Sequence, residues 1–136
     1  MKIKTITDQV WNELFVKPFI SIGFHPYQSK IMAVAIDNEG ICALKVIEDD
    51  HDARQKFFSE ISARYKGSPI AVFPGKTERF FGDFLRERSG KCTALKFILK
   101  GPEEKLKHWE SELECAFFKQ KAVTLSIDNP IQCSNL

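Results

Sequence analysis

The sequence lacks several features that would place it directly in a class of proteins. Its 136 residues contain no apolar run near the roughly twenty residues of a membrane-spanning helix, and residues 1–11 lack the continuous hydrophobic stretch of a secretory signal. The 20 basic residues are nearly balanced by 18 acidic ones, so the formal charge of +2 does not by itself predict binding to nucleic acid or to a membrane. These absences predict a cytoplasmic protein without membrane contact.

The four cysteines are too scattered to predict a zinc site or a disulfide framework. No two of them form a C-x-x-C pair, and none has a histidine within four residues; they are Cys42, Cys92, Cys115 and Cys133. A nucleophilic cysteine needs a base to form its thiolate, so free thiols are expected, with Cys42 and Cys115 as small buried residues. A Gly-rich phosphate loop, clustered metal ligands and a basic motif with interleaved aromatic residues are also absent. The sequence therefore predicts no cofactor and no metal.

Hydrophobic residues make up 43% of the chain and include 12 phenylalanines. A chain of this length and composition forms one folded domain that buries roughly two-thirds of its unfolded surface. The clearest element is a β-hairpin over residues 30–47. Two apolar runs there flank the turn formed by Asp37, Asn38, Glu39 and Gly40, which tolerate a left-handed backbone.

The remaining elements follow from capping residues and hydrophobic periodicity. Alternating residues predict a strand over 19–24, which makes three strands in antiparallel succession with the hairpin. The rest of the chain predicts a helix over 7–16, a helix over 51–65, a linker or edge strand over 70–75, a helix over 77–88, a strand or extended connector over 93–99, a helix that begins at Gly101-Pro102, and a loosely held tail after residue 121.

Two phrases in this order are similar to the N-terminal domain of the methylguanine-DNA methyltransferases. The first is GICAL at residues 40–44, followed by the acidic pair Asp49-Asp50 and the helix over 51–65. The second is LKFILKG at residues 95–101, followed by HWESEL at residues 108–113. The resemblance covers about residues 20–117. It implies an α+β fold with a three-stranded antiparallel meander and packed helices, resembling ribonuclease H.

The resemblance also implies a division of the chain. Residues 1–18 would be an N-terminal helix and lead-in, and residues 19–100 the ribonuclease H-like domain. Residues 101–121 would correspond to the first helix of the family's catalytic domain, and residues 122–136 would be a tail.

The family transfers an alkyl group from guanine in DNA to its own cysteine, within a Pro-Cys-His-Arg motif that this chain lacks. The tail residues Asn129, Pro130 and Cys133 echo part of that region, which makes Cys133 the candidate methyl acceptor, but no histidine or arginine follows it. The resemblance therefore implies a DNA-repair protein that does not transfer alkyl groups by itself.

Other candidate chemistry has simpler explanations in the sequence. A ribonuclease H-like nuclease would need a carboxylate on its first strand, and the strand over 19–24 contains none. Asp37 and Glu39 are expected to form the turn, while His25, His51 and His108 are expected to be structural or exposed. A positive patch that touches phosphates weakly is predicted around the third helix and its connector, from Arg79, Arg86, Arg88, Lys91, Lys96 and Lys100, although a solvated helix face would explain these residues equally well.

Two functions remain open at this stage. The first is a methylguanine-DNA methyltransferase-like protein of DNA repair that binds double-stranded DNA weakly. The second is a non-catalytic structural or interaction domain that docks a protein partner or forms a homo-oligomer, because the loss of a packed catalytic domain would expose apolar surface.

Overall fold

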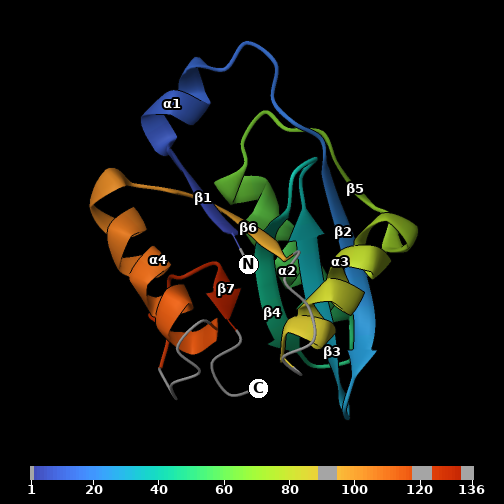
Figure 1. The fold of residues 1–136 in the computed structure, drawn as a ribbon. Helices are drawn as coiled ribbons and strands as arrows, with labels where there is room; N and C mark the ends of the chain where they lie inside the picture. Colours follow the sequence, from blue (N-terminus) through green and yellow to red (C-terminus); the bar gives the residue numbers. More distant parts are fainter. Residues whose placement is uncertain (1, 89–94, 118–123, 133–136) are drawn as a thin grey trace.

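The computed structural model describes residues 2–88, 95–117 and 124–132, which form a mixed α/β fold with a seven-stranded sheet and four helices (Figure 1). The elements are β1 (Lys2–Thr7), α1 (Asp8–Glu13), β2 (Ile20–Tyr27), β3 (Lys30–Ile36), β4 (Ile41–Ile47), α2 (His51–Arg64), β5 (Ile70–Val72), α3 (Pro74–Arg88), β6 (Lys96–Gly101), α4 (Glu103–Phe117) and β7 (Ile131–Gln132). None of the helices formed by the described residues is long and apolar enough to cross a membrane.

The sheet is mixed, which corrects the expectation of an antiparallel meander. Strands β2, β3 and β4 pair antiparallel in succession, as the hairpin and the preceding strand indicated. However, β5 joins β2 in parallel, and β6 and β7 both join β4 in parallel. The order across the sheet is β1-β6-β4-β3-β2-β5, with β7 beside β4. Segments from both ends of the chain therefore extend the central meander.

Two strands share one edge of β4. Strand β6 pairs with β4 only at the start of β4, where Ile41 lies opposite Phe97. Strand β7 pairs with the middle of β4, where Leu44 lies opposite Ile131. The expectation of a loosely held tail is wrong for residues 124–132, because Leu125, Asn129 and Ile131 are 5%, 2% and 0% exposed. This segment is held in place because it fills the edge of β4 that β6 leaves uncovered.

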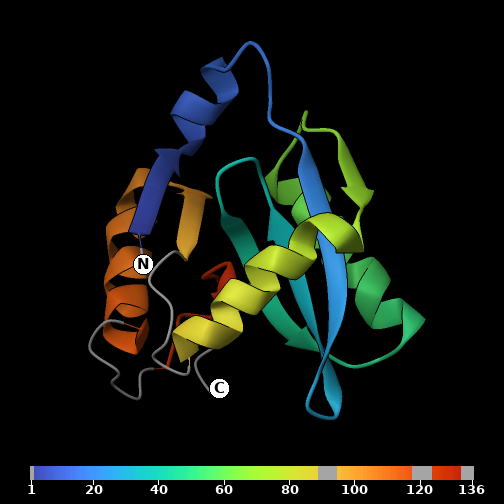
Figure 2. The ribbon, with the colours of Figure 1, turned by 45° about the vertical axis from the view of Figure 1, so that its right-hand side comes forward.

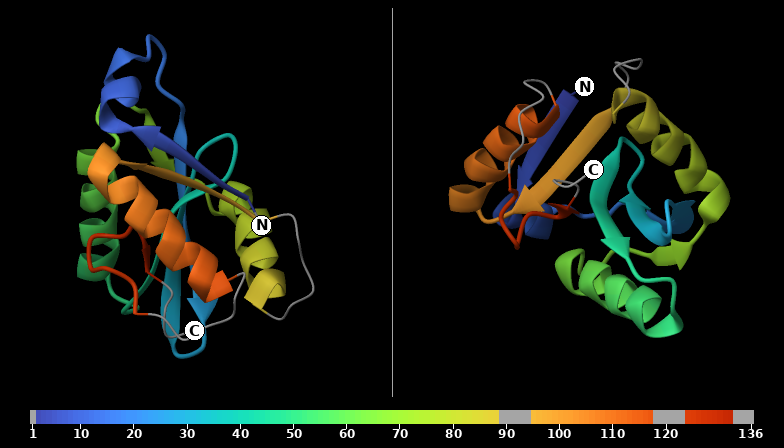
Figure 3. Two further views of the ribbon diagram at one scale, coloured as in Figure 1. Left: turned by 60° about the vertical axis from the view of Figure 1, so that its left-hand side comes forward. Right: turned by 90° about the horizontal axis from the view of Figure 1, so that it is seen from below.

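Helices cover both faces of the sheet. Helix α2 lies on one face, and α3 and α4 lie on the other (Figure 3). The larger core, on the α3 and α4 side, contains Phe84, Phe97, Trp109, Leu113 and Phe117 among others. The smaller core, on the α2 side, contains Trp11, Ile22, Phe57, Ile61 and Tyr65 among others. Both cores form because neighbouring residues of a strand point to opposite faces.

Local capping chemistry accounts for several of the predicted boundaries. The Asp50 carboxylate accepts the Ala53 N–H at 2.7 Å and begins α2. In the hairpin turn, Asp37 Oδ1 accepts the N–H groups of Glu39 and Gly40 at 2.7 and 3.0 Å. Gly67 follows α2 with φ of +88°, a backbone conformation that favours glycine. In each of these contacts the two partners lie within a few residues of each other in the chain, so the boundaries can be predicted from the sequence.

The N-terminal residues differ from the predicted helix over 7–16. Thr7 does cap a helix, since its Oγ1 accepts the Val10 N–H at 3.1 Å, but α1 is only six residues long. Residues 2–7 form β1, which pairs in parallel with β6 along its whole length. We call β1 and α1 together the N-terminal arm (residues 2–13). Residues 14–19 form the linker, which arches from α1 to β2 (Figures 1 and 2).

Candidate functional site

One candidate binding site in the described part of the chain is a cleft of about 840 Å³ between the N-terminal arm, the end of α2 and the junction of β6 with α4. It is lined by four cationic side chains and two carboxylates: Lys45, Arg64, Lys66, Lys100, Asp8 and Glu60. We call it the basic cleft. Its lining carries an excess of two positive charges, although the whole chain is almost neutral. The cleft therefore favours an anionic ligand.

Lys100 forms the inner part of the cleft. Its side chain is only 9% exposed, and its ammonium group pairs with the Asp8 carboxylate at 2.6 Å. The same ammonium lies 5.6 Å from the ring centre of Trp11 and 5.7 Å from that of Tyr65. A buried cation needs such partners because it has lost most of its hydration. Asp8 therefore compensates the charge of Lys100 and fastens α1 to β6.

The outer part of the cleft holds cations with fewer partners. Lys45 lies 3.5 Å from Glu60. Within the described part of the chain, neither Arg64 nor Lys66 forms an ion pair with a carboxylate. The Arg64 guanidinium lies 5.8 Å from the ring centre of Trp109, which positions it without neutralising it. Arg64 and Lys66 are therefore the side chains best able to bind an incoming anion.

The junction of β6 and α4 shapes the adjoining wall. A Cβ atom added at Gly101 would lie 2.4 Å from Cζ3 of Trp109, so glycine is needed for the indole to pack against this turn. Pro102 then precedes α4, whose first turn carries Glu103 and Glu104.

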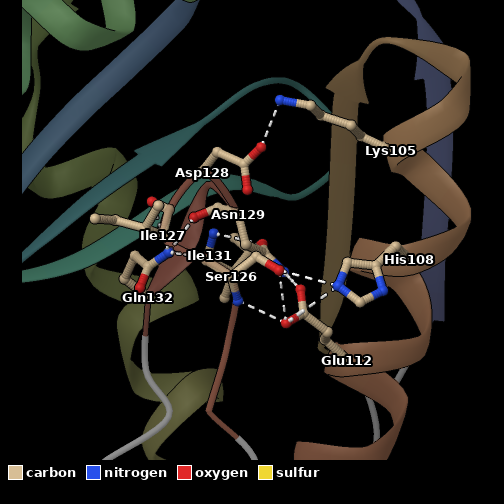
Figure 4. Close-up of polar contacts among 9 residues, drawn as sticks. All are labelled: Lys105, His108, Glu112, Ser126, Ile127, Asp128, Asn129, Ile131 and Gln132. Carbon is tan, nitrogen blue, oxygen red and sulfur yellow. Dashed lines mark hydrogen bonds and ion pairs between the residues drawn. The ribbon is translucent and has the colours of Figure 1, made fainter.

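A polar cluster holds residues 124–132 against α4 (Figure 4). Ile127 of this segment is 97% exposed and lines the cleft. The centre of the cluster is Glu112, a residue that is 8% exposed. One of its oxygens accepts the N–H and Oγ–H of Ser126 at 2.6 and 3.0 Å, and the other accepts the Asn129 amide at 3.1 Å. Asn129 in turn accepts the Ile131 N–H at 3.0 Å. The segment is therefore anchored mainly by one buried carboxylate.

This cluster contains a serine, a histidine and an acid, but its geometry does not suit a nucleophile. His108 Nε2 lies 3.0 Å from Ser126 Oγ and 3.8 Å from the Glu112 carboxylate. In a catalytic triad the acid orients the histidine, and the histidine accepts the serine proton. Here the Glu112 carboxylate accepts the hydrogen bond of the Ser126 hydroxyl directly, so His108 does not act as the base that accepts the serine proton. The cluster is a structural anchor.

No protein-family model, curated protein or solved structure matches this chain. The resemblance to methylguanine-DNA methyltransferases therefore depends on the two sequence phrases alone. The position of Cys42 within the first of them does not make it a candidate acceptor, because it is fully buried. Burial, together with the nearby Asp37 carboxylate, raises the pKa of the Cys42 thiol well above its usual range. A thiol held in its protonated form is a poor nucleophile.

The other predicted site residues are distributed as follows. Cys133, the candidate methyl acceptor, lies outside the described residues, as does Cys92. Cys115 is a half-buried thiol on α4. Asp37 forms the hairpin turn, and Glu39 pairs with Lys4 at 2.8 Å. In the part of the chain that the structure describes, no group of three or more His, Cys, Asp or Glu residues could hold a metal ion.

The predicted positive patch around α3 is not formed as expected. Lys96 and Lys100 alternate along β6 with Phe97 and Leu99, whose side chains join the core on the α3 side. The two lysines therefore point to the opposite face from α3, where Arg79 and Arg86 lie. Arg86 pairs with Asp83 on its own helix. Lys91 and the side chain of Arg88 lie outside the described residues.

The histidines agree with the expected structural or exposed roles. His25 is 9% exposed, its Nε2 lies 2.7 Å from Thr77 Oγ1, and its ring stacks on Phe81 with ring centres 4.8 Å apart. Burial lowers the pKa of His25, and the Glu78 carboxylate opposes that effect. His51 is exposed at the start of α2. None of these residues lines the basic cleft.

Sequence reasoning missed the residues that form the cleft, except for Lys100. Lys45, Arg64 and Lys66 come from β4, from α2 and from the turn after it, and no local spacing connects them. One signal for the neighbouring anchor was available. Glu112 lies three residues after Trp109 on the apolar side of α4, and an acid at such a position predicts a buried polar partner.

Proposed function

We propose that the chain is a non-catalytic binding domain of DNA-repair type that contacts the phosphates of duplex DNA through the basic cleft. It transfers no alkyl group by itself. The observation that supports this proposal is the pair Arg64 and Lys66, two cations at the outer part of the cleft that have no carboxylate partner in the described part of the chain. Phosphate groups supply the negative charge that such side chains bind.

We further propose a scaffold similar to the ribonuclease H-like N-terminal domain of methylguanine-DNA methyltransferases. Three antiparallel strands followed by a helix and by a fourth strand parallel to the first support this relation. The parallel strands β1, β6 and β7 are additions on the other side of the meander. The burial of Cys42 supports the absence of alkyl transfer to that residue.

The test is fluorescence anisotropy with a labelled duplex of about one helical turn, repeated over a range of salt concentrations. The logarithm of the affinity falls with that of the salt concentration by about 0.9 per neutralised phosphate. The double variant Arg64→Ala with Lys66→Ala should therefore bind more weakly and reduce that slope by about 1.8.

The matched control is Lys56→Ala with Arg79→Ala. It removes the same charge from exposed positions outside the cleft, so its slope should stay close to that of the natural chain. Equal losses in both double variants would show that only the net charge matters. That result, or the absence of DNA binding at low salt, would refute the role of the cleft.

A further inference from the structure

The N-terminal arm is held by an interface that does not depend on the linker. Strand β1 pairs with β6 from Lys2 opposite Lys96 to Thr7 opposite Gly101. The exposed ion pair between Lys4 and Glu39 adds a contact to the hairpin turn. Every one of these partners belongs to residues 39–101, so a second copy of the chain presents the same surface to the arm.

The arm also fits a specific socket. Trp11 is 4% exposed, and its ring lies edge to face on Tyr65 with ring centres 5.3 Å apart. Its Nε1 donates to the Lys66 carbonyl oxygen at 3.4 Å, and Asp8 pairs with the buried Lys100. The socket therefore combines shape, hydrogen bonding and charge, which makes it selective for this arm.

The linker carries apolar side chains that are exposed to solvent in the single chain. Phe15 is fully exposed, Val16 is 77% exposed and Leu14 is 36% exposed. The linker arches away from the sheet in both views, so its apex does not rest on the core (Figures 1 and 2). A single apolar side chain exposed to solvent is normal. Two adjacent ones beside the N-terminal arm indicate contact with a partner.

We propose that two copies of the chain exchange their N-terminal arms. Each arm pairs with β6 and enters the Trp11 socket of the other copy, which reproduces the contacts of the arm with β6 and with the socket at little cost. The two linkers then run side by side, and Phe15 and Val16 of one linker contact those of the other. The occupant of the exposed linker surface is therefore a second copy of the same chain.

The exchange makes the basic cleft a shared site. Asp8, Trp11 and Asn12 line the cleft and belong to the arm, so in the exchanged dimer they come from the second copy. This consequence relies on the proposed function for the role of the cleft, but the exchange itself is tested without DNA. A failure of DNA binding and a failure of exchange are therefore separate results.

The experiment combines light scattering with a cross-link between the arm and its socket. Light scattering of the natural chain at micromolar concentration should give about twice the 15.6 kDa of one chain. The variant Lys4→Cys with Glu39→Cys replaces two exposed residues, so it should fold. It is made in a chain whose Cys92, Cys115 and Cys133 are replaced by serine, so that the fully buried Cys42 is the one other thiol. A short bis-maleimide should join the two new cysteines between two chains in the exchanged dimer, and within one chain in a closed monomer.

On a denaturing gel, the double variant should therefore run as a covalent dimer. The same chain without the two new cysteines, and the two variants that carry only one of them, are treated with the same reagent as controls and should run as monomers. A monomer at every concentration up to about 100 µM would overturn the proposal. A dimer whose cross-link closes within one chain would overturn it as well, because the copies would then associate through another surface. Phe15→Ser with Val16→Ser should shift the dimer toward monomer.

Discussion

Replacement of Glu112 by alanine tests whether one buried carboxylate anchors residues 124–132. The change leaves the Ser126 N–H and the Asn129 amide without an acceptor, and Asn129 is 2% exposed. An unsatisfied buried donor costs about 1–3 kcal/mol, and the Ser126 N–H is only half-buried, so Glu112→Ala should lower the free energy of unfolding by roughly 2–4 kcal/mol. Glu112→Gln keeps one acceptor oxygen and should cost about half as much.

Urea unfolding followed by tryptophan fluorescence measures these differences. Glu104→Gln changes an exposed glutamate on the same helix and should stay within about 0.5 kcal/mol of the natural chain. In a double-mutant cycle, Asn129→Ala should cost less when Glu112 is already alanine, because the two residues share a hydrogen bond. If Glu112→Ala unfolds at the same urea concentration as Glu104→Gln, the anchor is not the carboxylate and the reasoning fails.

Three further predictions concern Gly23, His25 and alkyl transfer to the chain. A Cβ at Gly23 would lie 1.7 Å from Thr77 Oγ1, so Gly23→Ala should cost about 1–3 kcal/mol or more in urea unfolding, with partial relief by Thr77→Ala; Gly75→Ala, which meets nothing within 4 Å, is the neutral control. Burial lowers the pKa of His25 in the folded state, so the unfolded state binds the proton more readily. The free energy of unfolding should therefore be unaffected by this histidine above about pH 6.5 and should decrease below that pH. His25→Phe should flatten this part of the pH profile, and an unchanged slope would contradict the assignment. Incubation with methylguanine-containing duplex DNA should add no methyl mass, roughly 14 Da, to the intact chain. A gain that disappears in Cys133→Ser would make that cysteine the acceptor.

The parts of the fold that sequence predicted are those that local contacts determine. The hairpin was visible because Asp37 bonds to N–H groups two and three residues away, and α2 because Asp50 bonds to Ala53. The edge position of β5 was also visible, because Pro74 ends the apolar run and begins α3. Each of these signals lies within one turn or one cap.

The parts that sequence did not predict depend on distant partners. Residues 2–7 read as a lead-in to a helix because their pairing partner, β6, lies near the other end of the chain. Residues 124–132 lack periodicity, and their order comes from Glu112 and the free edge of β4. The basic cleft combines side chains of the arm, β4, α2 and β6, so no single stretch displays it. Such long-range sets appear only when the topology is known.

The pairing of β1 with β6 also sets an order of events during synthesis. Lys2 is synthesised 94 residues before its partner Lys96. At about 5–20 residues added per second, the arm waits roughly 5–20 s for its strand. During that time β1 stays unpaired, while the hairpin of β3 and β4 forms quickly from neighbouring residues. Until β6 is made, β1 has no partner in its own chain, so it is available to the β6 of another copy, as the proposed exchange requires.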